Sequence, residues 1–222
     1  MFCIPIIARD TEEAFRKMAI ASPLADIVEV RLDLMDSFEL GPIIRASVKP
    51  VLITYRSEKE GGMGKADPDT AAGYLISAIK EGVHLIDLEL GMPLTVRKRI
   101  LKAKGGTKAI ISIHINDRMP SRNELKRIFN ESIGAGGDIV KIVTRASRWD
   151  DNFRLLELIP EARDMGVDII AFCTGPLGRM SRIFSLLMGA HMTFTSIQKG
   201  EESADGQIPI MEMKELMEFF TP

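Results

Sequence analysis

"DIVKIVT", residues 138–144, is a short apolar run rich in β-branched residues, and a single lysine, Lys141, lies in its middle. Runs of this kind, bounded by turn residues, are typical of buried β-strands. Runs of similar length recur along the whole chain. The sequence therefore predicts eight strands, at residues 2–8, 27–33, 50–56, 84–90, 108–114, 138–144, 168–174 and 191–197.

Between the expected strands lie helical patterns such as residues 68–82 and 121–136, several of which open at Ser, Thr or Asp and close near Gly. Strict alternation of strands and helices indicates a parallel sheet. Eight such units predict a single-domain α/β protein, a (β/α)₈ TIM barrel over residues 1–222. An open doubly wound sheet is the alternative, but the first strand lacks the glycine-rich turn of dinucleotide-binding proteins.

The composition narrows the class of protein without naming a function. The chain is 45% hydrophobic and 27% charged, with a formal net charge of −2. This charge gives no electrostatic footprint for nucleic acid or an anionic membrane, and no apolar run approaches the roughly 20 residues that span a bilayer. Cys3 and Cys173 lie in apolar runs, which is typical of buried thiols in a reducing compartment. We therefore expect a cytoplasmic enzyme or small-molecule binding protein, with no nucleic-acid or membrane partner.

Polar side chains recur at every second position in three of the otherwise apolar strands. In a closed barrel, alternate side chains face the interior and the others face the helices. Polar residues would not face the apolar helix layer, so we expect them inside, toward the C-terminal mouth, where barrel enzymes keep their active sites. The residues are Glu29, Arg31 and Asp33, then Asp87 and Glu89, then Ser112 and His114.

The three histidines differ in their expected positions. His84 and His191 stand at the beginnings of strands, at the bottom of the barrel, where a structural role is expected. His114 ends its strand at the mouth, which favours a role in proton transfer. No other His or Cys lies at the mouth with metal-ligand spacing, so we expect chemistry without a metal or cofactor.

Lys141 has two interpretations. One is a buried ion pair with Glu29, Asp87 or Glu89. The other is a Schiff-base nucleophile, since desolvation and nearby cations such as Arg31 would disfavour the ammonium form. An iminium formed with a ketone acidifies the adjacent C–H bond, and a histidine on the neighbouring strand can remove that proton. This pairing suggests an aldolase, a transaldolase-like enzyme or a dehydratase.

Several short motifs, in this order and spacing, resemble the type I 3-dehydroquinate dehydratases of the shikimate pathway. They are "IVEVRLD", "TYRSEKEGG", "LIDLEL", "SIH", "DIVKI", "MSR" and "SADGQIP". The resemblance runs from residue 27 almost to the C-terminus. It implies a (β/α)₈ barrel, usually a homodimer, that dehydrates 3-dehydroquinate to 3-dehydroshikimate by syn elimination without a metal or cofactor.

The resemblance also implies roles for individual residues. Lys141 matches the lysine that forms the imine, His114 the histidine that moves the protons, and Glu60 the carboxylate that assists this histidine. The residues that match substrate-binding positions are Glu29, Arg31, Arg56, Arg182, Ser203 and Gln207, with Arg182 matching the arginine that binds the substrate carboxylate.

Alternatives stay open at this point. Arg182 could be a charge at a helix end, Arg56 and Glu60 an exposed ion pair in a flexible loop, and residues 174–179 a phosphate-binding turn. The chain reads "IHIN" at residues 113–116, where many family members have a "YHDF"-like run, so we expect a different arrangement around the His114 ring. A Schiff-base aldolase and a non-catalytic small-acid-binding barrel remain the two other candidate functions.

Overall fold

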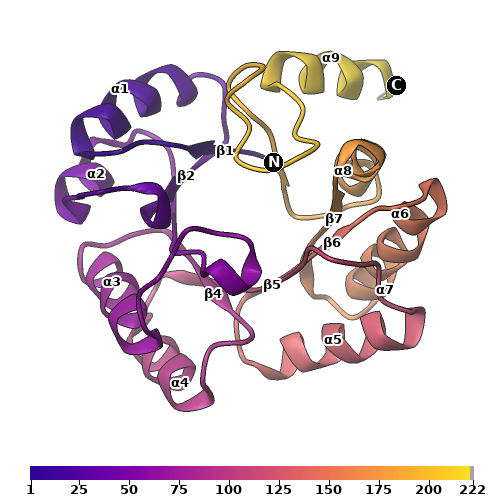
Figure 1. Ribbon diagram of the computed structural model, residues 1–222, viewed down its shortest axis with the longest axis horizontal. Helices are drawn as coiled ribbons and strands as arrows, with labels where there is room; N and C mark the ends of the chain where they lie inside the picture. The colour runs from indigo at the N-terminus through magenta and orange to yellow at the C-terminus, as the bar shows by residue number, and fades with distance from the viewer. Residues whose placement is uncertain (221–222) are drawn as a thin grey trace.

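The computed structural model describes residues 1–220 and contains an eight-stranded parallel sheet curled into a barrel (Figure 1). Every registered strand pair is parallel, and the order is β7-β6-β5-β4-β3-β2-β1-β8. The backbone N–H of His191, just before β8, donates to the carbonyl of Ile169 in β7 at 2.8 Å and nearly closes the barrel. The strands are β1 (Phe2–Ile6), β2 (Ile27–Arg31), β3 (Val51–Thr54), β4 (Leu85–Glu89), β5 (Lys108–Ile115), β6 (Ile139–Arg145), β7 (Asp168–Thr174) and β8 (Thr193–Phe194).

The helices form an outer ring around the strands (Figure 1). As the sequence predicts, several begin at a polar cap: the Asp10 side chain accepts from the N–H of Glu13, and the Ser121 side chain accepts from that of Glu124. Among residues 1–220, none of these helices combines the length and the apolar character needed to cross a bilayer. They are α1 (Thr11–Ala21), α2 (Leu40–Ala46), α3 (Pro68–Lys80), α4 (Leu94–Ala103), α5 (Arg122–Gly134), α6 (Trp149–Leu156), α7 (Leu158–Asp164), α8 (Arg179–Leu187) and α9 (Ile210–Phe220), with 3₁₀ turns η1 (Leu32–Leu34), η2 (Glu58–Glu60) and η3 (Pro176–Gly178).

Two elements differ from the sequence prediction. The helix expected between β6 and β7 is split into α6 and α7, because Pro160 has no N–H to donate and is accommodated in the first turn of a new helix. The eighth strand, expected at residues 191–197, is only two residues long. Beyond it, the backbone N–H of Ser196 donates to Ile208 and its carbonyl accepts from Ile210, so the chain there pairs with its own return segment.

The barrel interior is apolar at the bottom and polar toward the mouth. Above the apolar layer lie Glu29, Asp87, Ser112 and Lys141, each two positions further along its strand, and all four are buried. This confirms the prediction from the period-two pattern that polar side chains point into the barrel. An apolar floor therefore lies beneath a ring of polar side chains. The floor is formed by Cys3, Ile27, Leu52, Leu85, Ile110, Ile139, Ile170 and Met192.

Candidate active site

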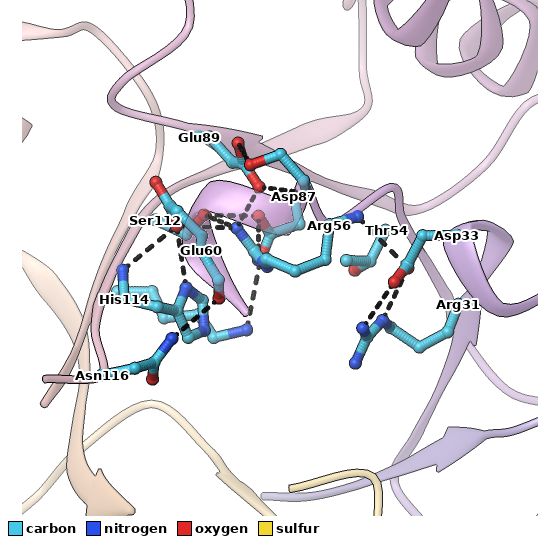
Figure 2. A network of polar contacts seen from close by, with 12 residues as sticks. Arg31, Asp33, Thr54, Arg56, Glu60, Asp87, Glu89, Ser112, His114 and Asn116 are labelled. Atoms are coloured by element: carbon cyan, nitrogen blue, oxygen red, sulfur yellow. Dashed lines mark hydrogen bonds and ion pairs between the residues drawn. The ribbon is translucent and has the colours of Figure 1, made fainter. Parts of the chain in front are cut away.

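A cavity opens at the C-terminal mouth of the barrel. Eight of the residues singled out from the sequence line it, and one, Glu60, lies behind the His114 ring. Figure 2 shows how the polar side chains on one side of the cavity converge. The eight lining residues are Glu29, Arg31, Arg56, His114, Lys141, Arg182, Ser203 and Gln207.

Lys141 is 4% exposed and has two neighbours that favour positive charge on its amine. Its Nζ lies 3.1 Å from Oδ2 of Asp87 in β4 and 4.2 Å from the centre of the Phe194 ring in β8. The buried ion pair considered from the sequence is therefore present, and Asp87 is the partner. Lys141 borders the cavity as well as pairing with Asp87.

Glu60 orients His114. Oε2 of Glu60 accepts from the backbone N–H of His114 at 3.1 Å and lies 3.0 Å from its Nδ1. Since the same oxygen also accepts from Arg56, we assign the ring proton to Nδ1, which leaves the Nε2 lone pair free to take a proton. Burial, together with the cations of Arg56 and Lys141, lowers the pKa of His114 well below its ordinary value, so the imidazole is neutral at pH 7.

The loop that carries Glu60 is held at several points, although the sequence suggested a mobile segment. Turn η2 ends at Gly61, whose φ of +82° suits glycine, and a Cβ there would lie only 2.6 Å from Nδ2 of Asn116. Asn116 itself donates to the Glu60 carbonyl at 3.0 Å. Ser57 donates to Glu89 through both its N–H, at 2.8 Å, and its hydroxyl, at 2.7 Å. Asn116, from the unusual "IHIN" run, thus helps to hold the Glu60 turn that contacts the His114 ring.

Arg56 joins the carboxylates on this side of the cavity (Figure 2). Its Nη1 lies 3.0 Å from Glu60 and 3.0 Å from Glu89 and donates to the Ser112 hydroxyl at 3.1 Å, while Nη2 lies 2.7 Å from Asp87. At 3% exposure, this guanidinium is committed to protein partners. Arg56 therefore positions the carboxylates around the cavity, as well as bordering it.

The carboxyl group of Glu60 is in an unusual electrostatic environment. Burial raises the pKa of Glu60 to about 8; Arg56 opposes this rise, and the neighbouring carboxylates of Glu89 and Asp87 add to it. A carboxyl that titrates near neutral pH, in contact with a histidine, is suited to proton transfer.

The second and third strands contribute a separate polar group. Arg31 makes two parallel hydrogen bonds to Asp33, at 2.8 and 2.7 Å, and Asp33 also accepts from the backbone N–H groups of Arg56 and Met63. Asp33 therefore fixes both Arg31 and the start of the Glu60 loop. In the same wall, Glu29 accepts from the Thr54 hydroxyl at 2.7 Å.

Arg182 is fully buried near the start of α8 and has no carboxylate within 4 Å among the described residues. Its guanidinium stacks at 4.3 Å on the Phe172 ring and makes only long contacts, 3.4 Å each, to the carbonyls of Phe194 and Asp205. Burial lowers the pKa of Arg182 to about 9, so it remains cationic at pH 7. Its Nε has no partner, and the site therefore suits an incoming anion.

The loop after β8 lies over the cavity. Ser203 and Gln207 bond to each other twice, at 2.8 and 2.9 Å, and both border the cavity. The loop packs tightly against the end of β7, since a Cβ at Gly206, whose φ is +82°, would collide with the carbonyl of Gly175.

Comparison with known proteins identifies the family. A profile for Type I 3-dehydroquinase matches residues 2–221. The chain is 35% identical over 221 residues to a 3-dehydroquinate dehydratase from Methanococcus vannielii, with 98% of each chain covered. It is 30% identical over 220 residues to a protein of the same name from Methanocaldococcus jannaschii, with 97% of each covered.

The chain belongs to the type I 3-dehydroquinase family.

Solved structures agree with this assignment. A type I 3-dehydroquinate dehydratase from Clostridium difficile, solved with covalently modified comenic acid, has a TM-score of 0.89 and 25% identity, covering 99% of this chain and 91% of that one. A 3-hexulose-6-phosphate synthase has a TM-score of 0.62 at 14% identity, which shows a shared fold alone. As a member of the 3-dehydroquinase family, the protein is an enzyme of the hydro-lyase class.

Sequence reasoning assigned no role to three residues that the structure connects to the site. Thr54 bonds to Glu29, Ser57 holds the Glu60 loop to Glu89, and Asn116 holds the turn itself. Thr54 and Asn116 carry a period-two signal, since Thr54 lies on an inward-facing strand position and Asn116 continues the series of Ser112 and His114, whereas Ser57 has no such signal. His84 and His191 do not border the cavity; His191 pairs with Asp168 at 3.3 Å at the bottom of the barrel, as expected for structural histidines.

Proposed function

We propose that the enzyme converts 3-dehydroquinate to 3-dehydroshikimate and water through an imine on Lys141, as a step of the shikimate pathway to aromatic amino acids. One observation carries this proposal: buried Lys141 lines a single cavity together with His114, which Glu60 orients. The same cavity is lined by Arg182, which has no carboxylate partner among the described residues. A nucleophilic amine, a base and an anion receptor are the parts that this elimination needs.

The first step is attack by the Lys141 amine on the substrate ketone. The Lys141 ammonium gives up two protons in all, one before and one after its Nζ forms the bond to the carbonyl carbon, and His114 passes both to the carbonyl oxygen, which leaves as water. The iminium that results withdraws electrons from the neighbouring carbon. His114 lies two residues further toward the mouth on β5 than Ser112, which is the register partner of Lys141, and is therefore placed above the new bond.

The elimination itself uses the same histidine. Neutral His114 accepts the proton from the carbon beside the iminium, and the imidazolium then donates it to the departing hydroxyl group. Glu60, which accepts the Nδ1–H bond, stabilises the imidazolium between these transfers. Water then hydrolyses the product imine and regenerates the Lys141 amine.

Substrate recognition is assigned to the remaining cavity residues. The substrate carboxylate pairs with Arg182, and the hydroxyl groups bind Glu29 and Arg31 on one wall and Ser203 and Gln207 on the loop above. Arg56 borders the same cavity and acts mainly by holding the carboxylates. None of these steps requires a metal or cofactor.

We also propose that the enzyme works as a homodimer, as the family resemblance implies, and in the cytoplasm, as its two free buried cysteines suggest. Sedimentation-velocity measurement on the purified chain tests the assembly: a species of about twice the chain mass is expected, and a single monomeric species at micromolar concentration contradicts it.

The chemical proposal is tested by incubating the protein with 3-dehydroquinate, following the ultraviolet absorbance of the conjugated product, and then reducing with borohydride. We expect turnover and one ligand-sized mass increment on Lys141. Lys141→Ala should lower turnover by at least roughly 10³-fold and abolish the increment. Lys102→Ala, at an exposed position on α4, is the matched control and should change neither.

The other outcomes separate the alternative functions. Cleavage of a carbon–carbon bond with the same increment on Lys141 indicates a Schiff-base aldolase. Binding of the substrate without turnover or increment indicates a non-catalytic small-acid-binding barrel. Full turnover by Lys141→Ala removes the imine mechanism.

A further inference from the structure

In the polar layer of the barrel, the two oxygens of the Asp87 carboxylate contact different cations. Oδ2 lies 3.1 Å from Nζ of Lys141, while Oδ1 lies 2.7 Å from Nη2 of Arg56 and accepts from the Ser112 hydroxyl. Figure 2 shows Asp87 beside the end of the Arg56 side chain. The Asp87 side chain is 1% exposed, so no solvent shares this charge.

Two neighbours of the Lys141 nitrogen are suited to a positive charge at that atom. Among residues 1–220, Asp87 is the only carboxylate within 4 Å of this Nζ, and the Phe194 face lies on it at 4.2 Å. A carboxylate and an aromatic face both stabilise positive charge. A site built only to release a free amine would have neither neighbour.

Positive charge at this nitrogen is required again after the amine has reacted. In the proposed function, on which this inference rests, the ammonium is replaced by an iminium that carries the same single charge at the same atom. The carbinolamine that forms between the ammonium and the iminium is neutral and lacks this positive charge. An imine that lost its proton would also be neutral and would be a poor electron acceptor. A fixed anion beside the nitrogen therefore favours the species that can react.

We propose that Asp87 is the counter-ion of the iminium on Lys141 and keeps the imine protonated throughout the elimination. Asp87 stays ionised and neither gains nor loses a proton: the N–C bond forms at Lys141, the C–O bond breaks, and the transferred protons move through His114. Arg56 and Ser112 hold the carboxylate in place from its other oxygen.

The charges around Asp87 agree with this role. Burial alone would raise its pKa, but the facing cations of Arg56 and Lys141 outweigh burial and lower the pKa of Asp87 below its ordinary value. The Ser112 hydrogen bond acts in the same direction. Asp87 is therefore an anion at every pH at which the enzyme would work.

Borohydride provides the test, because it reduces a cationic imine much faster than a neutral one. The full-length protein is mixed with 3-dehydroquinate, reduced at a series of pH values, and weighed by intact mass spectrometry. For Asp87→Asn we expect the upper pH limit of trapping to fall by about 1–3 pH units relative to the wild type, the size of effect that an opposite charge at this distance exerts.

Glu89→Gln is the matched control, since it removes another carboxylate bound to Arg56 but not one that contacts Lys141. This change should lower turnover through the Ser57 loop and leave the upper pH limit of trapping where it is in the wild type. A merely structural role for Asp87 would make the two variants behave alike.

Each result decides one point. Wild-type turnover without trapping overturns the imine mechanism itself. Wild-type trapping together with an unchanged pH limit in folded Asp87→Asn overturns only the counter-ion role. If Asp87→Asn does not fold, Ser112→Ala, which removes the bond that orients the carboxylate, should shift the limit in the same direction by a smaller amount, and no shift overturns the proposal.

Discussion

Arg56 and Arg182 border the same cavity and are both buried, at 3% and 0% exposure, but Arg56 has anionic neighbours and Arg182 has neutral ones. Arg56 lies within 3.0 Å of three carboxylates, those of Glu60, Asp87 and Glu89. Arg182 has an aromatic ring and two distant carbonyls. The carboxylates raise the pKa of Arg56 against the effect of burial, whereas burial lowers that of Arg182 to about 9.

The contrast separates two functions of buried charge. On the Arg56 side the charges neutralise one another, so the groups that carry out the chemistry are held in place before a substrate arrives. On the Arg182 side one charge remains uncompensated, at a cost in folding free energy, and its counter-ion is expected to come with the substrate. The predictions below perturb each side in turn.

After Lys141→Ala, the largest kinetic effect is expected from Arg182→Met. Loss of the guanidinium removes a charged contact to the substrate carboxylate. This should raise the activation free energy by about 2–5 kcal/mol and so lower kcat/KM by roughly 30- to 5,000-fold. Steady-state kinetics with 3-dehydroquinate measures this. Arg179→Met, the same change at an exposed position on the same helix, should stay near the wild type, and equal losses in both variants would mean that charge on α8 acts only generally.

A smaller effect is expected from Glu60→Gln on the paired side. In the wild type, Glu60 ionises at about pH 8, so kcat/KM should rise with pH up to about 8 as the carboxylate that supports His114 forms. The variant should lose this rise and fall below the wild type by up to about 10²-fold at pH 8 and above, with a smaller difference at pH 6.

Glu58→Gln provides the comparison for that experiment, because Glu58 is exposed in the same 3₁₀ turn. It should keep the wild-type pH profile. A profile of Glu60→Gln that still rises toward pH 8 would assign the titration to another group.

The smallest effect is expected from Asn116→Ala, which removes one exposed hydrogen bond to the Glu60 carbonyl. This hydrogen bond should stabilise the ordered conformation of the loop by about 0.5–1.5 kcal/mol, so its loss should decrease kcat roughly two- to tenfold. Asn116→Asp should lose more, because its carboxylate cannot donate to that carbonyl and also repels the carbonyl oxygen. Asn123→Ala on α5 should have no effect, and an unchanged kcat for both Asn116 variants would show that the other contacts suffice to hold the loop.

The period of the polar residues made the barrel and the mouth predictable, because strand side chains alternate between interior and exterior. The sequence could place Glu29, Asp87 and Glu89 inside, but it could not choose which of them pairs with Lys141. That choice depends on strand register, which sets Ser112 and not His114 opposite Lys141 and leaves Asp87 within reach.

The full set of Arg56 partners was also beyond the sequence. Arg56 was predicted as a substrate-binding residue, with an ion pair to Glu60 as the alternative, and only the structure shows that its guanidinium also contacts Asp87 and Glu89 on the neighbouring strand β4. The absence of a counter-ion beside Arg182 within the described residues is a property of three-dimensional packing and has no sequence signal. The split of the sixth helix at Pro160 did have one, since proline lacks the N–H that a continuous helix requires.

The measurement that tests the contrast most directly is urea unfolding of Arg56→Met and Arg182→Met side by side at pH 7. Arg56→Met leaves three buried carboxylates without their shared cation and should lower the free energy of unfolding by about 3–5 kcal/mol. Arg182→Met removes an uncompensated charge and should leave that free energy unchanged or raise it by up to about 4 kcal/mol. Similar losses of stability in both variants would contradict the account.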